Sequence, residues 1–442
     1  MNPSVHQSGL LATRRFLPLF VTQFLGALND NVIKNAMIVL LTFHAADWTS
    51  LAPEVVANLA AGIFMLPFLL FSASAGQLAD KFDKARLARL VKLLEILIVL
   101  VAGAGFLARE IVILFGALFL LGLHSTFFGP IKYALLPEHL REEELIGGNA
   151  LIEAGTFVAI LVGTLLGGLL ASHAGAGDVI TLAGLLIAGG GYLASRFIPA
   201  APPPDAGLRI ETNFLVLTWR TLLLPRAERA VFLAILGISW FWLYGALFLA
   251  QFPAYTRNVL GGGEGVVTLL LFTFTIGISI GSLACERLSG GRVELGLVPL
   301  GSIGLTVFGL DLAWASPDGL VAATPVGVVE MLGRPVIWRI LADLVLLGTF
   351  GGFFIVPLYA LVQQRSPVSH RARIIASNNI YNACFMVSGA LVAALLFDRG
   401  LTIPWLFATA ALCNAAVAIY IYGLLPEFLD RFAVWIKNLI KI

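Results

Sequence analysis

The chain has 442 residues, of which 59% are hydrophobic and 12% charged, and its formal net charge at pH 7 is +2. A soluble globular protein carries about 25% charged residues, so this composition excludes an ordinary water-soluble enzyme or binding domain. The small net charge does not indicate a nucleic-acid partner, because the basic residues belong to short segments between long apolar blocks.

The apolar blocks are long enough to cross a bilayer as helices. A spanning helix needs about 20 consecutive apolar residues, and backbone hydrogen bonding in lipid permits only helices or closed barrels. The blocks are rich in Leu, Ala, Gly and Phe and lack the alternation of barrel strands, so we predict an all-α membrane protein. The predicted spans are residues 16–44, 52–79, 88–108, 111–136, 145–172, 177–198, 229–257, 264–288, 293–315, 337–364, 372–397 and 402–424.

Basic residues predict the orientation, because cytoplasmic loops are enriched in Lys and Arg. With the N-terminus placed inside, the cytoplasmic segments hold roughly four basic residues for each one outside. The densest group is Lys81, Lys84, Arg86, Arg89 and Lys92. We therefore expect a multi-pass membrane protein with both termini in the cytoplasm.

The sequence divides into two similar parts. Residues 199–228 form a long polar interval with three consecutive prolines, which separates six predicted spans from six others. We predict an N-terminal bundle at 1–198, a cytoplasmic linker at 199–228, a C-terminal bundle at 229–424 and an amphipathic tail at 425–442. Short matches recur at corresponding places, such as Gly76-Gln77-Leu78-Ala79 and Gly281-Ser282-Leu283-Ala284. Paired repeats around a midplane site are a common transporter plan.

Several motifs resemble a known family. The segment from Gly76 to Arg86 is similar to the loop motif between helices 2 and 3 of the major facilitator superfamily, although Asp83 replaces its glycine and Ala85 replaces a basic residue. More specific are the strings at residues 23–31, 127–133, 353–359 and 369–373. Together they resemble the bacterial lysophospholipid transporters of this superfamily over nearly the whole chain, which implies the major facilitator fold.

This resemblance also implies an activity and partners. Members of this branch move lysophospholipids, chiefly lysophosphatidylethanolamine, from the outer to the inner leaflet of the bacterial inner membrane for re-acylation, so the resemblance implies that location for this chain. They occur alone or fused ahead of a glycerophospholipid acyltransferase, and residues 425–432 look like the junction to that domain. The expected partners are therefore the lysolipid substrate, membrane lipids and an acyltransferase.

Charged residues inside predicted spans are costly and need a reason. Asp30 is the only carboxylate that we place near the middle of a span in the first half, and Lys34 follows it one turn later on the same face. The two charges either neutralise each other or bind a headgroup, with Asp30 attracting an ammonium and Lys34 a phosphate. Asn31, between them, joins the predicted substrate-binding set.

A second pair is predicted nearer the cytoplasm. Lys132 lies about one turn from the cytoplasmic end of its span, where a lysine can also extend to the interface. Glu153 lies at a similar depth in the next span, so a Lys132–Glu153 pair would form a gate or a phosphate site. Tyr133 completes the predicted substrate-binding residues. In the second half, Asp311 and Asp343 are expected to be solvated or paired with Arg339.

Gating residues are predicted from the loop motif and from helix bends. Asp80, Lys81, Lys84 and Arg86 carry charges that can pair in one state and separate in another. Pro130 and Pro357 lie at equivalent points of the fourth and tenth spans, where each removes a backbone hydrogen bond and allows a bend. Packing alone explains the prolines equally well. Gly155, Gly163, Gly167 and Gly168 are expected to permit close helix approach.

No catalytic, metal or cofactor site is expected. His173 and Asp178 have the H-x4-D spacing of glycerolipid acyltransferases, but they lie in a short loop without a domain around them. Two alternatives to lysolipid transport stay open. One is a proton-driven exporter of drugs or small metabolites, and the other is a non-transporting membrane partner of an acyltransferase.

Overall fold

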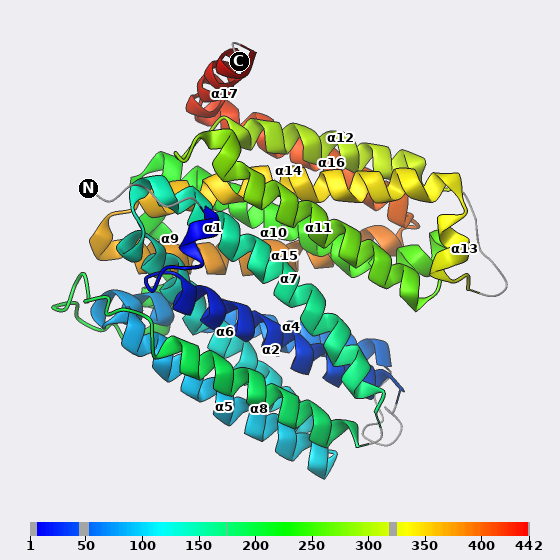
Figure 1. Ribbon diagram of the computed structural model, residues 1–442, viewed down its shortest axis with the longest axis horizontal. Coiled ribbons are helices and arrows are strands. Elements are labelled where there is room, and N and C mark those ends of the chain that lie inside the picture. Colours follow the sequence, from blue (N-terminus) through cyan, green and yellow to red (C-terminus); the bar gives the residue numbers. More distant parts are fainter. Residues whose placement is uncertain (1–6, 44–52, 174, 318–324, 441–442) are drawn as a thin grey trace. The chain divides into compact units, whose positions relative to one another are not determined.

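Figure 1 shows the computed structural model, which describes residues 7–43, 53–173, 175–317 and 325–440. The elements of these residues are helices, apart from one isolated bridge between Gly262 and Val326. Twelve helices in this part of the chain are long and apolar enough to span a membrane. The predicted fold class and number of spans are confirmed.

The long helices follow the predicted blocks. The first six are α2 (Leu17–Phe43), α4 (Pro53–Lys81), α5 (Lys84–Ala108), α6 (Ile111–His139), α7 (Leu145–Ala171) and α8 (Ala176–Ser195). The other six are α10 (Arg229–Tyr255), α11 (Glu264–Ser289), α12 (Leu297–Ala315), α14 (Pro335–Arg365), α15 (Arg371–Asp398) and α16 (Ile403–Leu424). The shorter elements are α1 (Gln7–Leu10), η1 (Glu142–Glu144), α9 (Phe214–Leu223), η2 (Leu224–Ala227), η3 (Thr256–Leu260), α13 (Val328–Leu332), η4 (Val368–His370) and α17 (Glu427–Ile440).

Helix α5 begins four residues earlier than predicted, for a local reason. The Asp83 side chain accepts a hydrogen bond of 2.8 Å from the backbone nitrogen of Arg86. This side-chain cap satisfies one of the free N–H groups of the first turn. The charged first turn therefore belongs to the helix.

The chain forms two compact units. Unit 1 holds Met1–Glu144, Val158–Glu228 and Gln363–Ala383, and unit 2 holds Leu145–Phe157, Arg229–Val362 and Cys384–Ile442. Helices α7, α14 and α15 thus contribute residues to both units. The predicted division into the sequence halves 1–198 and 229–424 describes the repeat, and it stays a prediction.

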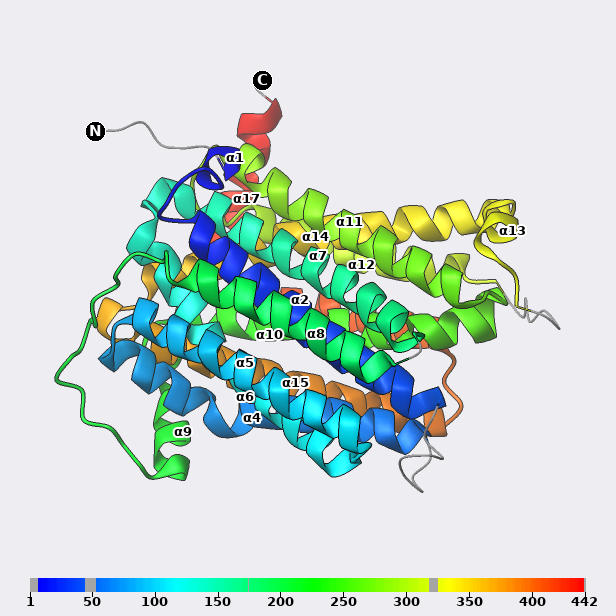
Figure 2. The same cartoon turned by 60° about the horizontal axis from the view of Figure 1, so that its bottom comes forward.

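In unit 1 the main helix contacts are α4 with α6, α5 with α6, α5 with α8 and α2 with α8. Figures 1 and 2 show α5 and α8 side by side. The second half of α7 packs on α2 through Gly163, where a Cβ atom would lie 2.6 Å from the Leu28 carbonyl oxygen. Gly167 meets the Val32 carbonyl in the same way, whereas Gly168 faces open space. The expected close approach is confirmed for Gly163 and Gly167 and is wrong for Gly168.

In unit 2 the corresponding helices pack in the corresponding pairs. Helix α12 contacts α16, as α5 contacts α8 in unit 1, and α10 also contacts α16. The α10–α16 contact includes a stack of Phe248 on Phe407, with ring centroids 4.3 Å apart. The shared pattern of pairs supports the internal repeat that the sequence matches predict.

The polar linker at 199–228 contains α9 and lies within unit 1. Lys81 Nζ donates to the Leu208 carbonyl at 2.7 Å, and Gln77 exchanges hydrogen bonds of 3.0 and 3.3 Å with the backbone of Glu211. Backbone groups of the linker therefore hold it along the end of α4.

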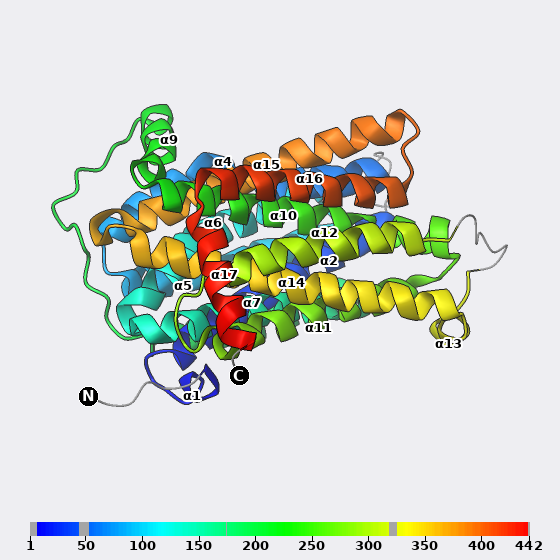
Figure 3. The same cartoon turned by 90° about the horizontal axis from the view of Figure 1, so that it is seen from above.

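The predicted amphipathic tail is the helix α17, which packs on α12 and α16. Phe428 is fully buried, and Trp435 Nε1 donates to the Leu288 carbonyl at 2.9 Å. Figure 3 shows α17 crossing the ends of helices α12 and α16. The apolar face of the tail thus covers unit 2, at least through Phe428 and Trp435.

Candidate functional site

Charged and polar side chains meet near the middle of three helices of unit 1. Asn29 and Asp30 come from α2, Lys92 and Glu95 from α5, and His124 and Ser125 from α6. We call these six residues the charged cluster. Each lies well inside its helix, and all three helices are long and apolar enough to span a membrane, so the helices themselves carry the charges to bilayer depth.

Lys92 and Glu95 form the core of the charged cluster. Both side chains are fully buried, and Lys92 Nζ donates to Glu95 Oε2. Asn29 Nδ2 donates to the other carboxylate oxygen, Glu95 Oε1, at 2.7 Å. A buried charge is tolerated only where it is paired and hydrogen-bonded. These contacts satisfy that condition for the Lys92–Glu95 pair.

Glycines make room for the lysine. A Cβ atom on Gly191 of α8 would lie 2.6 Å from Lys92 Cε and 2.9 Å from Lys92 Nζ. A Cβ atom on Gly26 of α2 would lie 3.2 Å from the same Nζ. The lysine head therefore occupies space that larger side chains on α2 and α8 would fill.

His124 lies between the two carboxylates of the cluster. Its Nε2 is 3.2 Å from Glu95 Oε2, and its Nδ1 is 3.8 Å from Asp30 Oδ1. Ser125, the next residue of α6, donates its hydroxyl to Asp30 Oδ2. Asp30 is buried, and its Oδ1 atom has no hydrogen-bond partner among the described residues.

The charges of the cluster leave one carboxylate without a fixed cation. Lys92 and Glu95 neutralise each other, and Asp30 has only the titratable His124 and the neutral Ser125 among the described contacts. When His124 is neutral, the cluster carries one negative charge at a depth where charge is costly. Such a centre attracts a proton or an organic cation.

Lys34 makes its described contacts with Asn31 and Phe64. Its Nζ donates to Asn31 Oδ1 at 3.1 Å and lies 5.3 Å from the centroid of the Phe64 ring. The described contacts contain no ion pair between Lys34 and Asp30 within 4 Å, and whether the two charges neutralise each other or bind a headgroup stays a prediction. Asn31 and Lys34 instead form a second polar position, one turn along α2.

The structure does not bring the second predicted pair into one unit. Lys132 and Tyr133 lie on α6 in unit 1, with Lys132 Nζ 4.6 Å from the centroid of the Tyr133 ring. Glu153 lies in the first half of α7, which belongs to unit 2. A Lys132–Glu153 gate or phosphate site therefore stays a prediction.

Asp80, at the end of α4, binds the first turn of α15. Its carboxylate accepts hydrogen bonds from the backbone nitrogens of Ala372 and Arg373, at 3.0 and 3.3 Å, and from Arg373 Nε at 2.9 Å. A carboxylate at a helix N-terminus satisfies free N–H groups and complements the helix dipole. Gly76 allows this approach, because a Cβ atom there would lie 2.8 Å from Arg373 Cα.

The other predicted gating charges have different partners from Asp80. Lys84 Nζ pairs with Glu138 of α6 at 2.6 Å, and Lys81 binds the linker carbonyl of Leu208. Arg86 contributes the backbone N–H that Asp83 caps. The basic residue that pairs with Asp80 is thus Arg373. Arg373 belongs to the motif at residues 369–373, but it is not among the predicted gating residues.

A separate ion pair ties the N-terminal segment to η1. Arg15 Nη2 donates to Glu144 Oε1 at 2.6 Å, and Arg141 Nη2 donates to the same oxygen at 3.0 Å. The hydrogen bond to Glu144 raises the pKa of Arg15 above its ordinary value. This end of unit 1 is therefore held by ion pairs at two places, around Glu144 and around Asp80.

Pro130 and Pro357 lie inside α6 and α14, as predicted.

In unit 2, Arg339 Nε donates a hydrogen bond to Asp311 Oδ2 at 3.1 Å, which confirms the expected Asp311–Arg339 pair. Asp343 is 3% exposed, so it is not solvated.

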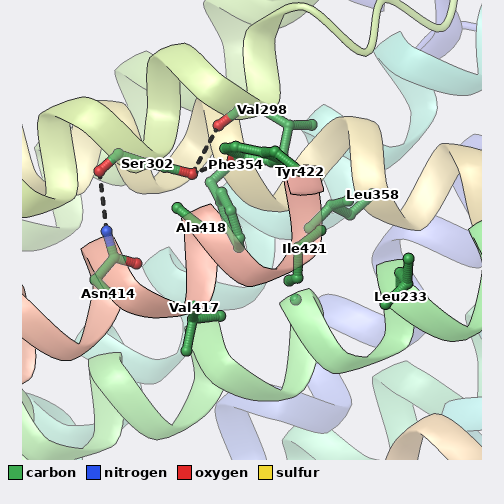
Figure 4. Close-up of a pocket in the computed structure, with 11 residues that line it drawn as sticks. Leu233, Val298, Ser302, Phe354, Leu358, Asn414, Val417, Ala418, Ile421 and Tyr422 are labelled. Carbon is green, nitrogen blue, oxygen red and sulfur yellow. Dashed lines mark hydrogen bonds between the residues drawn. The ribbon is translucent and has the colours of Figure 1, made fainter. Parts of the chain in front are cut away.

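Unit 2 contains a small pocket that is distinct from the charged cluster (Figure 4). Its walls come from α10, α12, α14 and α16, and apolar side chains such as Phe354, Leu358 and Val417 provide most of them. The Asn414 amide donates to the Ser302 carbonyl at 2.9 Å and accepts from Trp240 Nε1 at 2.8 Å. These polar groups bind one another, so we assign the pocket to helix packing and not to a substrate.

Comparison with known families decides what kind of protein this is. The model of the Major Facilitator Superfamily matches residues 19–345. The chain belongs to the major facilitator superfamily.

Relatives within this superfamily support the resemblance seen in the motifs. The chain is 28% identical to the lysophospholipid transporter LplT of Klebsiella pneumoniae over 372 residues, which cover 83% of this chain and 84% of that protein. It is 29% identical to LplT of Escherichia coli over 376 residues, covering 84% and 85% of the two chains. The predicted relationship to bacterial lysophospholipid transporters is confirmed.

Solved structures of facilitators have the same fold. The Escherichia coli fucose:proton symporter FucP aligns over 93% of this chain and 99% of its own, with a TM-score of 0.69 and 14% identity. The human organic anion transporter MFSD10 aligns over 96% and 99%, with a TM-score of 0.68 and 14% identity. At this identity the similarity establishes the fold alone.

Of the six residues in the charged cluster of this facilitator, only Asp30 is among the substrate-binding residues predicted from the sequence. Lys92 was counted with the cytoplasmic loop charges, and that assignment is wrong, because Lys92 is fully buried inside α5. Asp30 was taken as the only mid-span carboxylate of the first half, which is also wrong, because Glu95 lies near the middle of α5. The available signal was the i,i+3 pair of opposite charges inside a predicted span, together with His124 in another.

Proposed function

We propose that this facilitator transports lysophospholipids, with lysophosphatidylethanolamine as its principal substrate. The supporting observation is the similarity to LplT proteins over more than four fifths of the chain, combined with a charged cluster inside the unit that carries their motif at residues 23–31. The proposed site is Asp30 with Ser125 and His124 around it.

The chemistry of the substrate fits this site. The headgroup of lysophosphatidylethanolamine carries an ammonium and a phosphate. The carboxylate of Asp30 lacks a fixed cationic partner among its described contacts and attracts the ammonium. Lys34, one turn along α2, is a cation for the phosphate. Charged groups at bilayer depth commonly mark a substrate pathway.

The proposed direction is from the outer to the inner leaflet of a bacterial inner membrane. A single-chain lipid dissolved in the outer leaflet reaches the site sideways, without leaving the bilayer. Alternating movement of the two repeats then exposes the headgroup on the other side. An acyltransferase, fused or separate, is the proposed consumer of the delivered lysolipid.

The test is lysolipid transport by the purified full chain in sealed liposomes. Fluorescent lysophosphatidylethanolamine is placed in the outer leaflet, and its movement is followed by its protection from a membrane-impermeant quencher. Transport above that of protein-free liposomes is expected. Binding of the lysolipid without movement would contradict the transporter and favour a delivery subunit for an acyltransferase.

A proton-driven exporter is the second candidate, because His124 between Asp30 and Glu95 is also an arrangement for carrying a proton. The same liposomes distinguish the two functions. An exporter moves a cationic dye when an imposed pH gradient is present, and it leaves the lysolipid where it was added.

A further inference from the structure

The linker helix α9 has one buried and one exposed apolar face. Leu217 and Thr221 are 6% and 1% exposed, whereas Leu215 and Trp219 are 73% and 63% exposed. Both pairs have a spacing of four residues, so each pair forms a stripe along the helix. Leu223, 37% exposed, extends the exposed stripe. Such a face needs a partner outside the described contacts.

The buried face packs on membrane-spanning helices of unit 1. Leu217 clusters with Ala73 of α4 and Ile380 of α15, and Leu69 and Leu222 pack against this cluster. Tyr381 of α15 donates its hydroxyl to the Leu222 carbonyl at 3.1 Å. Helix α9 is therefore fixed along the line where α4 meets the first half of α15.

The contacts of the linker run from the end of α4 toward the interior of its span. Leu208 binds Lys81, Glu211 binds Gln77, and Leu217 packs on Ala73. Ala73 lies about 12 Å along the helix axis from Lys81, at 1.5 Å per residue. Figures 2 and 3 show α9 running crosswise to the long helices of unit 1. A crosswise helix at this level lies in the region of lipid headgroups and upper acyl chains.

The surroundings of α9 are basic. Arg209, Arg220, Arg226 and Arg229 lie in or beside it, against Glu211 and Glu228. The Arg220 side chain is 71% exposed, and its Nη1 lies 3.5 Å from Glu211 Oε2. Apolar residues with a tryptophan on one face and arginines beside them are typical of helices that lie in a membrane interface, and anionic lipids attract such arginines.

We propose that α9 is an interfacial helix that inserts Leu215 and Trp219 into the leaflet at the Lys81 end of α4. Arg220 and Arg226 bind anionic lipid headgroups in that leaflet. The partner is lipid and not a protein, because the face of α9 that packs on the bundle rests on membrane spans, and its opposite face points away from them. The proposal concerns the linker and does not depend on which solute the facilitator carries.

The test measures the depth of single labelled positions in the full chain. Cys384 and Cys413 are exposed and are first replaced by serine, while the buried Cys285 is kept. A cysteine at position 215 or 219 is labelled with an environment-sensitive fluorophore, and a cysteine at the exposed linker residue Gly207 is the matched control. The protein is placed in nanodiscs of phosphatidylcholine with or without phosphatidylglycerol. Monodisperse elution in size-exclusion chromatography verifies that each labelled variant is folded.

At positions 215 and 219 we expect quenching by lipids that carry a nitroxide high on the acyl chain, and weak quenching by aqueous iodide. Position 207 should show the opposite. Phosphatidylglycerol should strengthen lipid quenching at position 219 by about twofold through the attraction of arginines. Arg220→Gln with Arg226→Gln should remove that increase, and Arg257→Gln, at an exposed arginine of η3, should not. Iodide access at 215 and 219 equal to that at 207 would overturn the proposal and leave this face for a protein partner.

Discussion

Asp30 is the residue on which substrate recognition depends in the proposed mechanism. We expect Asp30→Asn to lower lysophosphatidylethanolamine flux by about tenfold, which corresponds to a lost charge interaction of about 1.4 kcal/mol. Flux of lysophosphatidylglycerol, which lacks the ammonium, should fall much less. Both are measured by leaflet exchange in sealed liposomes.

The double variant Asp30→Asn/Lys34→Met separates recognition from simple neutralisation. Lys34 donates to Asn31 and makes no ion pair with Asp30, so removing the lysine should not restore flux. Equal losses for both lysolipids, followed by recovery in the double variant, would show that Asp30 only balances Lys34.

The Lys92–Glu95 pair makes a different prediction, about stability. Glu95→Gln leaves Lys92 buried and charged, and breaking one side of a buried ion pair costs about 3–5 kcal/mol. The apparent melting temperature in detergent should therefore fall sharply. Lys92→Met/Glu95→Gln should lose less than Glu95→Gln, because the unpaired charge is gone.

The exposed Asp311–Arg339 pair of unit 2 is the control for this stability experiment. Its side chains are 31% and 46% exposed, and solvent-exposed ion pairs contribute little. Asp311→Asn should therefore leave the melting temperature almost unchanged. A loss as large as that of Glu95→Gln would contradict the argument from burial.

At the scale of helices, Asp80 joins α4 to the start of α15. Asp80→Asn keeps the shape of the side chain but weakens the contacts with Arg373 and with the backbone nitrogens of Ala372 and Arg373. We expect slower lysolipid flux, with equilibrium binding within a few-fold of the unmodified protein, because Asp80 lies at the end of α4, whereas the charged cluster lies near the middle of α2, α5 and α6. If Asp80→Asn abolished lysolipid binding while the accessibility of the α4 and α15 ends to a labelling reagent stayed normal, that result would contradict a gating role.

The approach of α7 to α2 gives a matched pair of substitutions. Gly163→Ala places a methyl group 2.6 Å from the Leu28 carbonyl oxygen, so α2 and α7 must separate, whereas Gly168→Ala meets no atom within 4 Å. Alanine favours a helix by about 1 kcal/mol over glycine. We therefore expect Gly163→Ala to lower the apparent melting temperature and Gly168→Ala to keep or raise it. Equal effects would show that the α2–α7 contact does not limit stability.

For the whole molecule, the sequence predicts the spans well and the site incompletely. Span prediction succeeds because hydrocarbon demands long apolar helices, and that demand is local in sequence. The charged cluster depends on which faces of α2, α5 and α6 meet, and composition does not report this. Asp30 stands out because a mostly apolar stretch separates it from the preceding basic residues Arg14 and Arg15, whereas Glu95 follows Lys92 at the end of a run of basic residues that begins at Lys81.

The choice of partner for Asp80, at the Lys81 end of α4, shows the same limit. Asp80 is surrounded in sequence by Lys81, Lys84 and Arg86, yet its charged partner is Arg373, far along the chain. Local charge density predicted that Asp80 has a gating environment, but only the fold selects among the available cations. The repeated motifs that begin at Gly76 and Gly281 likewise indicate that α4 and α11 are equivalent helices, but they do not predict which helices pack against them.

The orientation of the whole chain in its membrane is the last prediction. Basic residues favour a cytoplasmic N-terminus, linker and C-terminal tail, and moving Lys92 from the loop into α5 does not change this imbalance. Single cysteines at Gly207 and Asn438 should react with an impermeant maleimide only after the membrane is opened, whereas a cysteine at Asn258 should react in intact cells. All three positions are exposed in the structure, so burial does not explain a failure to label. Labelling of position 207 or 438 from outside, with position 258 protected, would invert the topology and place the Asp80–Arg373 contact on the outer face.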